Sequence, residues 1–184
     1  MENLLENLDF KDLIKKIKIN RINFVRGLGI VEDRFELNFK ANNEEIIIEI
    51  ETNFRIRNQK EVLLSFNDLY LDNNRKEMSV KKYRSQVDIE KSYLYKQLEF
   101  INSILINAKP KNVIFKSYGD LYISFYRQGI VLEILNDTHL EDACLYRIIY
   151  KNEKIYYVTE CYVQNNKLAF KNLNLNNFLL NRNI

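Results

Sequence analysis

The residues best suited to chemistry surround the single histidine of the chain, His139. Asp137, Glu141 and Asp142 lie within three residues of it, and carboxylates together with imidazole are ligands of zinc and manganese. Their spacing, however, matches no ligand signature of a metal site. We therefore interpret residues 137–142 as an acidic loop exposed to water, and we expect neither a metal nor another cofactor.

Two glutamates, Glu49 and Glu133, have the residue type of a catalytic carboxylate pair. Both lie in runs where apolar and polar residues alternate, and Arg55 and Arg147 lie in similar runs. Opposite charges on neighbouring strands stabilise each other, so we interpret these four residues as structural ion pairs on a sheet. No glycine-rich stretch precedes a helix, which argues against a phosphate-binding loop. We expect no catalytic residue and no enzyme activity.

Composition and charge narrow the class of protein. The 184 residues fit one compact domain or two small ones that share a core, and 46% of them are hydrophobic. The net charge of +3 comes from 28 basic and 25 acidic side chains, a balance too even to indicate nucleic-acid binding by itself. Two cysteines are too few for a disulfide framework and suggest a reducing compartment.

The amino terminus lacks the basic-then-apolar order of a secretion signal. No apolar run approaches the roughly 20 residues of a membrane-spanning helix. We therefore expect a cytoplasmic protein that does not contact a membrane.

The clearest secondary structure lies at residues 112–136, where three strand-like runs are separated by two glycine-containing turns. In the second run, Leu121, Ile123 and Phe125 alternate with polar or aromatic residues, which places them on one face of a sheet. Glycine supplies the positive φ angle that tight hairpins require. This stretch predicts an antiparallel meander with one apolar face.

Similar patterns predict the remaining elements. A short amphipathic helix is expected at 9–17, and a longer one at 88–108, where apolar residues recur at helical spacing. The expected strands are 18–26, 34–40, 45–51, 144–150 and 154–163, with 54–56 and 61–66 continuing the first sheet. The last twenty residues are expected to add a short edge strand or a helix.

The predicted elements occur in the same order twice, a helix followed by a meander. Residues 35–39 resemble 121–125, 47–50 resemble 131–134, and 55–56 resemble 147–148. Offsets of about 84 to 92 residues are typical of a tandem duplication. The sequence therefore predicts an α+β fold with two related halves, each a helix followed by an antiparallel meander, packed about a pseudo-twofold axis. The expected divisions are 1–71, a basic connector at 72–86, and 87–184.

Two segments, 48–56 and 63–70, carry a resemblance to a known group of proteins. An apolar strand ends in an aromatic-arginine pair, and a later strand closes on an aspartate followed by an apolar and an aromatic residue. In this pattern the chain resembles a group of small uncharacterised bacterial proteins, some of which are similar to immunity proteins of toxin loci. The chain has Phe54 where the group has tryptophan and Glu49 where it has histidine. The resemblance implies duplicated helix–meander halves and no particular chemistry.

Candidate partner-binding residues fall into three groups. Tyr122 and Tyr126 lie opposite the expected core face, and tyrosine suits protein interfaces. The acidic residues Asp137, Glu141 and Asp142 complement a basic partner. The basic connector, which includes Tyr83, either tracks a phosphate backbone or is a solvated link. Its basic residues are Arg75, Lys76, Lys81, Lys82 and Arg84.

Together these patterns favour a non-catalytic protein that binds another protein and acts by occlusion. The leading hypothesis is an immunity protein that neutralises a bacterial toxin. One alternative is an inhibitor of a host defence nuclease, encoded by a mobile element or phage. The other is a nucleic-acid-binding protein that uses the basic connector.

Overall fold

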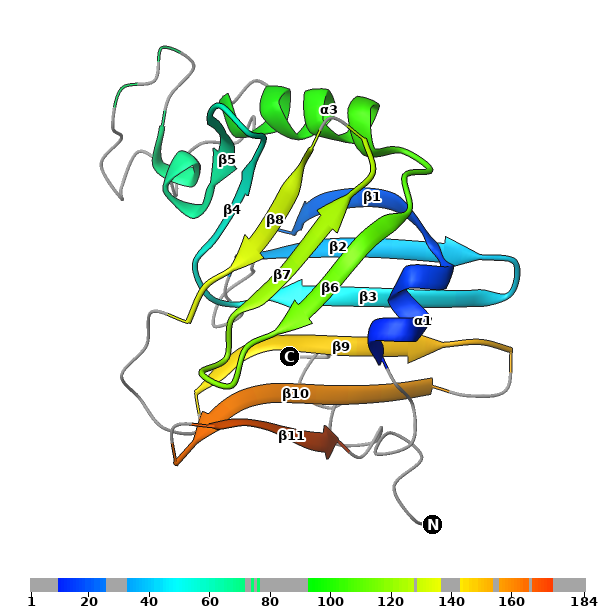
Figure 1. Ribbon diagram of the computed structural model, residues 1–184. Coiled ribbons are helices and arrows are strands. Elements are labelled where there is room, and N and C mark those ends of the chain that lie inside the picture. The colour runs from blue at the N-terminus through cyan, green and yellow to red at the C-terminus, as the bar shows by residue number, and fades with distance from the viewer. Residues whose placement is uncertain are drawn as a thin grey trace.

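The part of the chain that the computed structural model describes forms an α+β fold dominated by strands (Figure 1). Two antiparallel sheets pack against each other, and the strands of one cross those of the other. The described residues are 10–25, 33–71, 74, 76, 93–127, 129–136, 143–153, 156–165 and 167–173. The α+β class expected from the sequence is confirmed.

One sheet has six strands in the order β1-β2-β3-β9-β10-β11. The strands are β1 (Lys18–Val25), β2 (Arg34–Ala41), β3 (Glu44–Ile50), β9 (Cys144–Lys151), β10 (Tyr156–Gln164) and β11 (Lys167–Leu173). Asn42 and Asn165, with positive φ angles of 47° and 52°, lie in the turns that join β2 to β3 and β10 to β11. The sheet therefore combines strands from both ends of the sequence.

The other sheet has five strands in the order β5-β4-β8-β7-β6. The strands are β4 (Phe54–Arg57), β5 (Val62–Ser65), β6 (Pro110–Phe115), β7 (Leu121–Phe125) and β8 (Val131–Ile134). Residues 54–56 and 61–66 were expected to continue the first sheet, and this expectation is wrong, because the chain crosses after β3 and β4 pairs with β8. Alternation along a strand shows which face is buried and does not show which strand is its neighbour.

The two crossings between the sheets are bonded to each other. After β3, the carbonyl of Asn53 accepts a hydrogen bond from the backbone N–H of Leu135 at 2.8 Å. The Thr52 hydroxyl donates to the carbonyl of Leu135 at 3.0 Å. Thr52 and Asn53 follow β3, and Leu135 directly follows β8. These bonds therefore hold together the two places where the chain leaves one sheet for the other.

The apolar faces of the two sheets form one continuous core. Phe35 of β2 and Phe54 of β4 meet across the gap between the sheets, with ring centroids 4.2 Å apart. Leu37, Ile56 and Ile123 are each fully buried in the same cluster. Burying one such side chain stabilises a fold by about 1.5–3 kcal/mol, so this core is the main favourable term.

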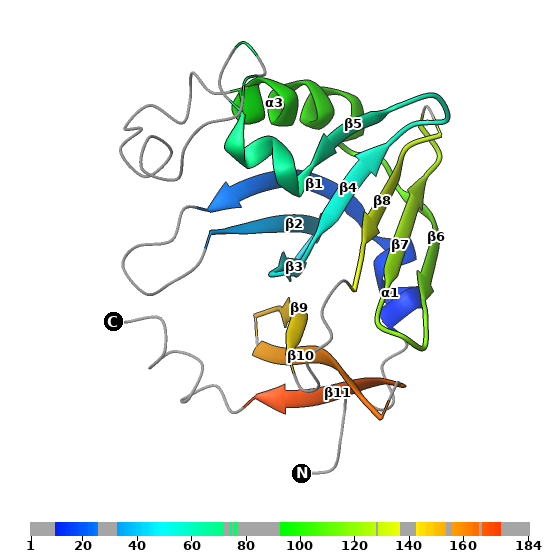
Figure 2. The same ribbon diagram turned by 90° about the vertical axis from the view of Figure 1, so that its left-hand side faces the viewer.

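Each helix packs against the first strand of the other half of the chain. Helix α1 (Phe10–Lys16) contacts β6, and α3 (Tyr93–Leu105) contacts β1. Figure 2 shows α3 above β1 and α1 beside β6. The buried stripe that the sequence predicted for the longer helix is present, formed by Leu94, Leu98, Ile101 and Leu105. A short 3-10 helix, η1 (Phe66–Tyr70), follows β5.

Strand pairing follows the same scheme in both sheets. The β2–β3 and β7–β8 pairs share a register: Phe35 faces Ile50 and Leu37 faces Ile48, while Leu121 faces Ile134 and Ile123 faces Leu132. The first strand of each meander has a register shift at the corresponding place, between Ile19 and Arg21 in β1 and between Pro110 and Asn112 in β6. The order β1-β2-β3-β9-β10 thus matches β6-β7-β8-β4-β5 position by position.

The turn between β6 and β7 ties the five-stranded sheet to the far end of the other sheet. Gly119, in this turn, has φ +102°. A Cβ atom there would lie 2.5 Å from Leu145 Cδ1 and 2.8 Å from Val163 Cγ2. The neighbouring Ser117 carbonyl accepts a hydrogen bond from the backbone N–H of Leu168. Glycine is therefore required at this position for both its φ angle and its lack of a side chain.

We expect Gly119→Ala to lower the free energy of unfolding by about 3 kcal/mol, because strain and overpacking add at this position. Gly129→Ala is the matched control, since Gly129 also has a positive φ, +61°, and a Cβ there would meet only the flexible Gln59 side chain at 3.2 Å. Its cost should be about 1 kcal/mol. Urea unfolding measures both, and equal costs would contradict the packing described for the β6–β7 turn.

Candidate functional site: the outward face of the five-stranded sheet

The five-stranded sheet has one face in the core and one face toward solvent. In Figure 1 the strands β4, β8, β7 and β6 face the viewer, and neither α1 nor α3 lies in front of them. The strand register places one row of side chains across this outward face: Ser65, Arg55, Glu133, Tyr122 and Ile114. A second row includes Val62, Arg57, Val131 and Ser124. Cross-strand pairing thus gathers charged, aromatic and apolar groups in one place.

A buried carboxylate and two arginines occupy the middle of this face. Glu133 is only 2% exposed. The Arg55 Nε–H donates to Glu133 Oε2, and the Arg57 Nε–H donates to Oε1 at 2.7 Å. A carboxylate withdrawn from water is costly unless it is paired and hydrogen-bonded, and here each oxygen has its own arginine. The cluster carries a net charge of +1, and the arginine side chains remain 45% and 40% exposed.

A tyrosine beside this cluster is held by a second buried carboxylate. The Tyr122 hydroxyl donates to Asp120 Oδ2 at 2.9 Å, and the backbone N–H of Asn136 donates to Oδ1 at 2.8 Å. The hydrogen bond to the carboxylate, followed by burial, raises the pKa of Tyr122 from 10.0 to about 12. Tyr122 is therefore fixed in place, half-buried, on the strand next to that of Glu133.

Large apolar side chains border the charged cluster. Val62 on β5, opposite Arg57, is 51% exposed, and Ile114 on β6, opposite Tyr122, is 45% exposed. Tyr118 and Tyr126, in the turns at the two ends of β7, are 50% and 70% exposed. Exposed apolar and aromatic residues that surround a fixed charged group are typical of protein interfaces.

The six-stranded sheet has a glutamate and an arginine at the corresponding register positions, in a different setting. Glu49, 1% exposed, lies opposite Arg147 in the β3–β9 register, just as Glu133 lies opposite Arg55. Arg147 contacts Glu51 and binds Glu160 through two nitrogens at 3.0 Å. Arg34 contacts Glu49 at 3.4 Å and Glu36 at 3.2 Å. In this sheet two arginines, Arg34 and Arg147, are thus shared by four carboxylates, those of Glu36, Glu49, Glu51 and Glu160.

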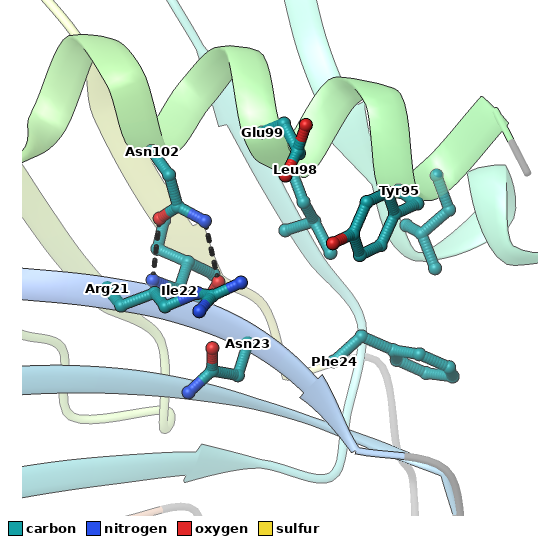
Figure 3. Close-up of a pocket in the computed structure, with 9 residues that line it drawn as sticks. Arg21, Ile22, Asn23, Phe24, Tyr95, Leu98, Glu99 and Asn102 are labelled. Atoms are coloured by element: carbon teal, nitrogen blue, oxygen red, sulfur yellow. Dashed lines mark hydrogen bonds between the residues drawn. The ribbon is translucent and has the colours of Figure 1, made fainter. Parts of the chain in front are cut away.

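A shallow groove of about 120 Å³ lies between β1 and α3 (Figure 3). Asn102 of α3 spans it, accepting the backbone N–H of Ile22 at 2.7 Å and donating to its carbonyl at 2.9 Å. Both bonds use backbone groups on the open edge of β1, so the asparagine replaces a missing neighbouring strand. This groove is therefore explained by the fold, because its central polar contact protects a sheet edge.

The expected partner-binding residues are only partly within the described chain. Tyr122 and Tyr126 lie on or next to the outward face, and Lys76 is described without the rest of its basic cluster. The residues outside the described part are Arg75, Lys81, Lys82, Arg84, Asp137, His139, Glu141 and Asp142. Arg57 was missed by the sequence analysis, although its position two residues after Arg55 places both on one face of a strand.

The described residues include no group of three or more histidine, cysteine, aspartate or glutamate side chains arranged to hold a metal. Burial raises the pKa of the Cys144 thiol to about 12 and that of Cys161 well above its usual value, so both are poor nucleophiles. Within the described part, no helix has the length and apolar character needed to cross a membrane.

Comparisons of the chain with protein-family models, with curated proteins and with solved structures gave no match. The properties of the site therefore rest on its own geometry.

The Tyr122–Asp120 bond predicts a titration that NMR of the tyrosine ring carbons can follow. Because the folded pKa is raised, the bond contributes to stability below pH 10 and this contribution is lost as pH rises from 10 through about 12. In Asp120→Asn, the pKa of Tyr122 should move back toward 10, because the negatively charged acceptor is gone. An unchanged Tyr122 titration in that variant would contradict the role assigned to the carboxylate.

Proposed function

We propose that the protein is a non-catalytic binding protein that occludes a protein partner with the outward face of its five-stranded sheet. The observation that carries the proposal is the composition of this face: a fixed arginine pair and a fixed tyrosine, bordered by half-exposed valine and isoleucine. Arginine and tyrosine are among the residues most enriched at energetically important positions of protein interfaces.

The resemblance to small bacterial proteins favours one biological setting for such a face. We propose an immunity protein, which blocks a toxin by covering its working surface and needs no chemistry of its own. An inhibitor of a defence nuclease, encoded by a mobile element, would need the same kind of face. The genes beside this one distinguish the two settings.

We also propose that the chain arose by duplication and that its halves are related by a pseudo-twofold axis. Support comes from the matched strand orders, the shared β2–β3 and β7–β8 registers, and the register shifts at the same place in β1 and β6. The reciprocal packing of α1 on β6 and α3 on β1 adds to it. In this arrangement the halves exchange their last strands, so each sheet contains three strands of one half and the final strands of the other.

The proposed binding face predicts which surface variant loses a partner. In affinity capture from extracts of the native host, wild-type protein should retain one protein partner at a one-to-one ratio. The double variant Val62→Ser/Ile114→Ser should lose this partner. Both residues are about half exposed, so the variant should fold. Phe100→Ser/Ile106→Ser is the matched control, because these residues are 51% and 49% exposed on or next to α3.

Chemical cross-linking of the captured complex provides a second measurement, since cross-links should form at Lys60 and Lys111, which are exposed next to this face. The proposal fails if wild-type protein captures only nucleic acid or nothing. It also fails if the control variant loses the partner while the Val62/Ile114 variant retains it.

A further inference from the structure

We infer that Arg55 and Arg57 form the anchor of the binding face and that they bind carboxylate side chains on an acidic surface of a protein partner. This inference rests on the proposed function and names the chemistry that the partner must supply. It differs from the sequence expectation, in which acidic residues of this chain meet a basic partner.

The geometry of the arginine pair leaves binding capacity toward solvent. A guanidinium has five N–H donors, and the bonds to Glu133 use the single Nε–H of each arginine. The terminal nitrogens, with four donors on each side chain, belong to groups that are 45% and 40% exposed. Two guanidinium groups held side by side by one buried carboxylate are therefore already ordered to bind an external carboxylate in bidentate fashion.

The equivalent pair in the six-stranded sheet shows what a purely structural arrangement looks like. Arg147 is 21% exposed, and both Nε and the terminal nitrogens contact carboxylates of the same chain. In the six-stranded sheet four carboxylates share two arginines, whereas in the five-stranded sheet two arginines share one glutamate. One arginine is enough to neutralise the charge of Glu133, so the second leaves a net charge of +1, and this surplus points to an external anion.

The surroundings favour an acidic protein over nucleic acid. Lys60, Lys111 and Lys116 are exposed near the face, while Asp120 is committed to Tyr122 and the Asn136 amide. Val62 lies directly opposite Arg57 in the β4–β5 register, and an apolar neighbour of this kind strengthens an ion pair by excluding water. A phosphate backbone instead requires an extended track of cations, and its binding is dominated by salt-dependent contacts.

Binding of a fluorescent oligoglutamate peptide to the full chain, followed by anisotropy at low ionic strength, tests the inference. The test variant is Arg55→Gln/Arg57→Gln/Glu133→Gln, in which amides replace the whole cluster and no buried charge is left unpaired. Its affinity for the peptide should fall by about tenfold or more, because two charge-assisted interactions are removed.

The six-stranded sheet supplies a control with the same charge change. Lys18, Lys40 and Glu45 are two cations and one anion of a cross-strand row that continues to Lys151, which pairs with Glu45 at 2.6 Å. Lys18→Gln/Lys40→Gln/Glu45→Gln should bind the peptide as wild type does. Equal losses in the two variants would show a general charge effect and would overturn the inference.

Two further measurements complete the test. Arg55→Lys/Arg57→Lys keeps the charges and removes the planar donors, so it should bind the peptide several-fold more weakly than wild type even if the triple variant does not fold. An oligothymidylate of equal charge should bind more weakly than the peptide, and tighter binding through the same arginines would overturn the choice of a protein partner.

Failure of this inference is distinguishable from failure of the proposed function. If the captured partner is lost by Val62→Ser/Ile114→Ser but retained by the triple variant, the face binds protein and the arginine pair is not its anchor.

Discussion

The pairing of β3 with β9, together with that of β4 with β8, is the constraint on which the rest of the structure depends. Each pairing joins strands that are far apart in the sequence, and each places a buried glutamate opposite an arginine. Without them the six-stranded sheet would divide into two three-stranded pieces, and β4 and β5 would have no sheet to join. The continuous core between the sheets follows from these two pairings, because they fix both sheets at once.

Much of the secondary structure could be predicted from the sequence, because the pattern of alternation is local. Leu121, Ile123 and Phe125 are buried on one face of β7, as their spacing indicated. The Glu133–Arg55 contact was also within reach, since each residue interrupts an apolar run with a charge. The crossing of the chain after β3 was not, because nothing in residues 51–53 indicates which sheet comes next.

Other features could not be predicted because they depend on a distant neighbour. Asn102 lies beside the buried stripe of α3, one turn after Leu98, and its residue type alone does not indicate that it bonds both backbone groups of Ile22. The requirement for Gly119 similarly arises from Leu145 and Val163, which follow it by more than twenty residues. The surplus of arginine at Glu133 becomes visible only when the two sheets are compared.

Each sheet thus has a buried glutamate opposite an arginine at the strand pairing that joins its two parts, so both arrangements require the two sheets to form together. Native-state hydrogen exchange measures this dependence directly. Amides of β2 and β3 in one sheet and of β7 and β8 in the other should exchange with the same free energy of opening, equal to that of global unfolding. If the amides of one sheet exchange at a clearly lower free energy while the other stays protected, the sheets form independently, which contradicts their coupling through the β3–β9 and β4–β8 pairings.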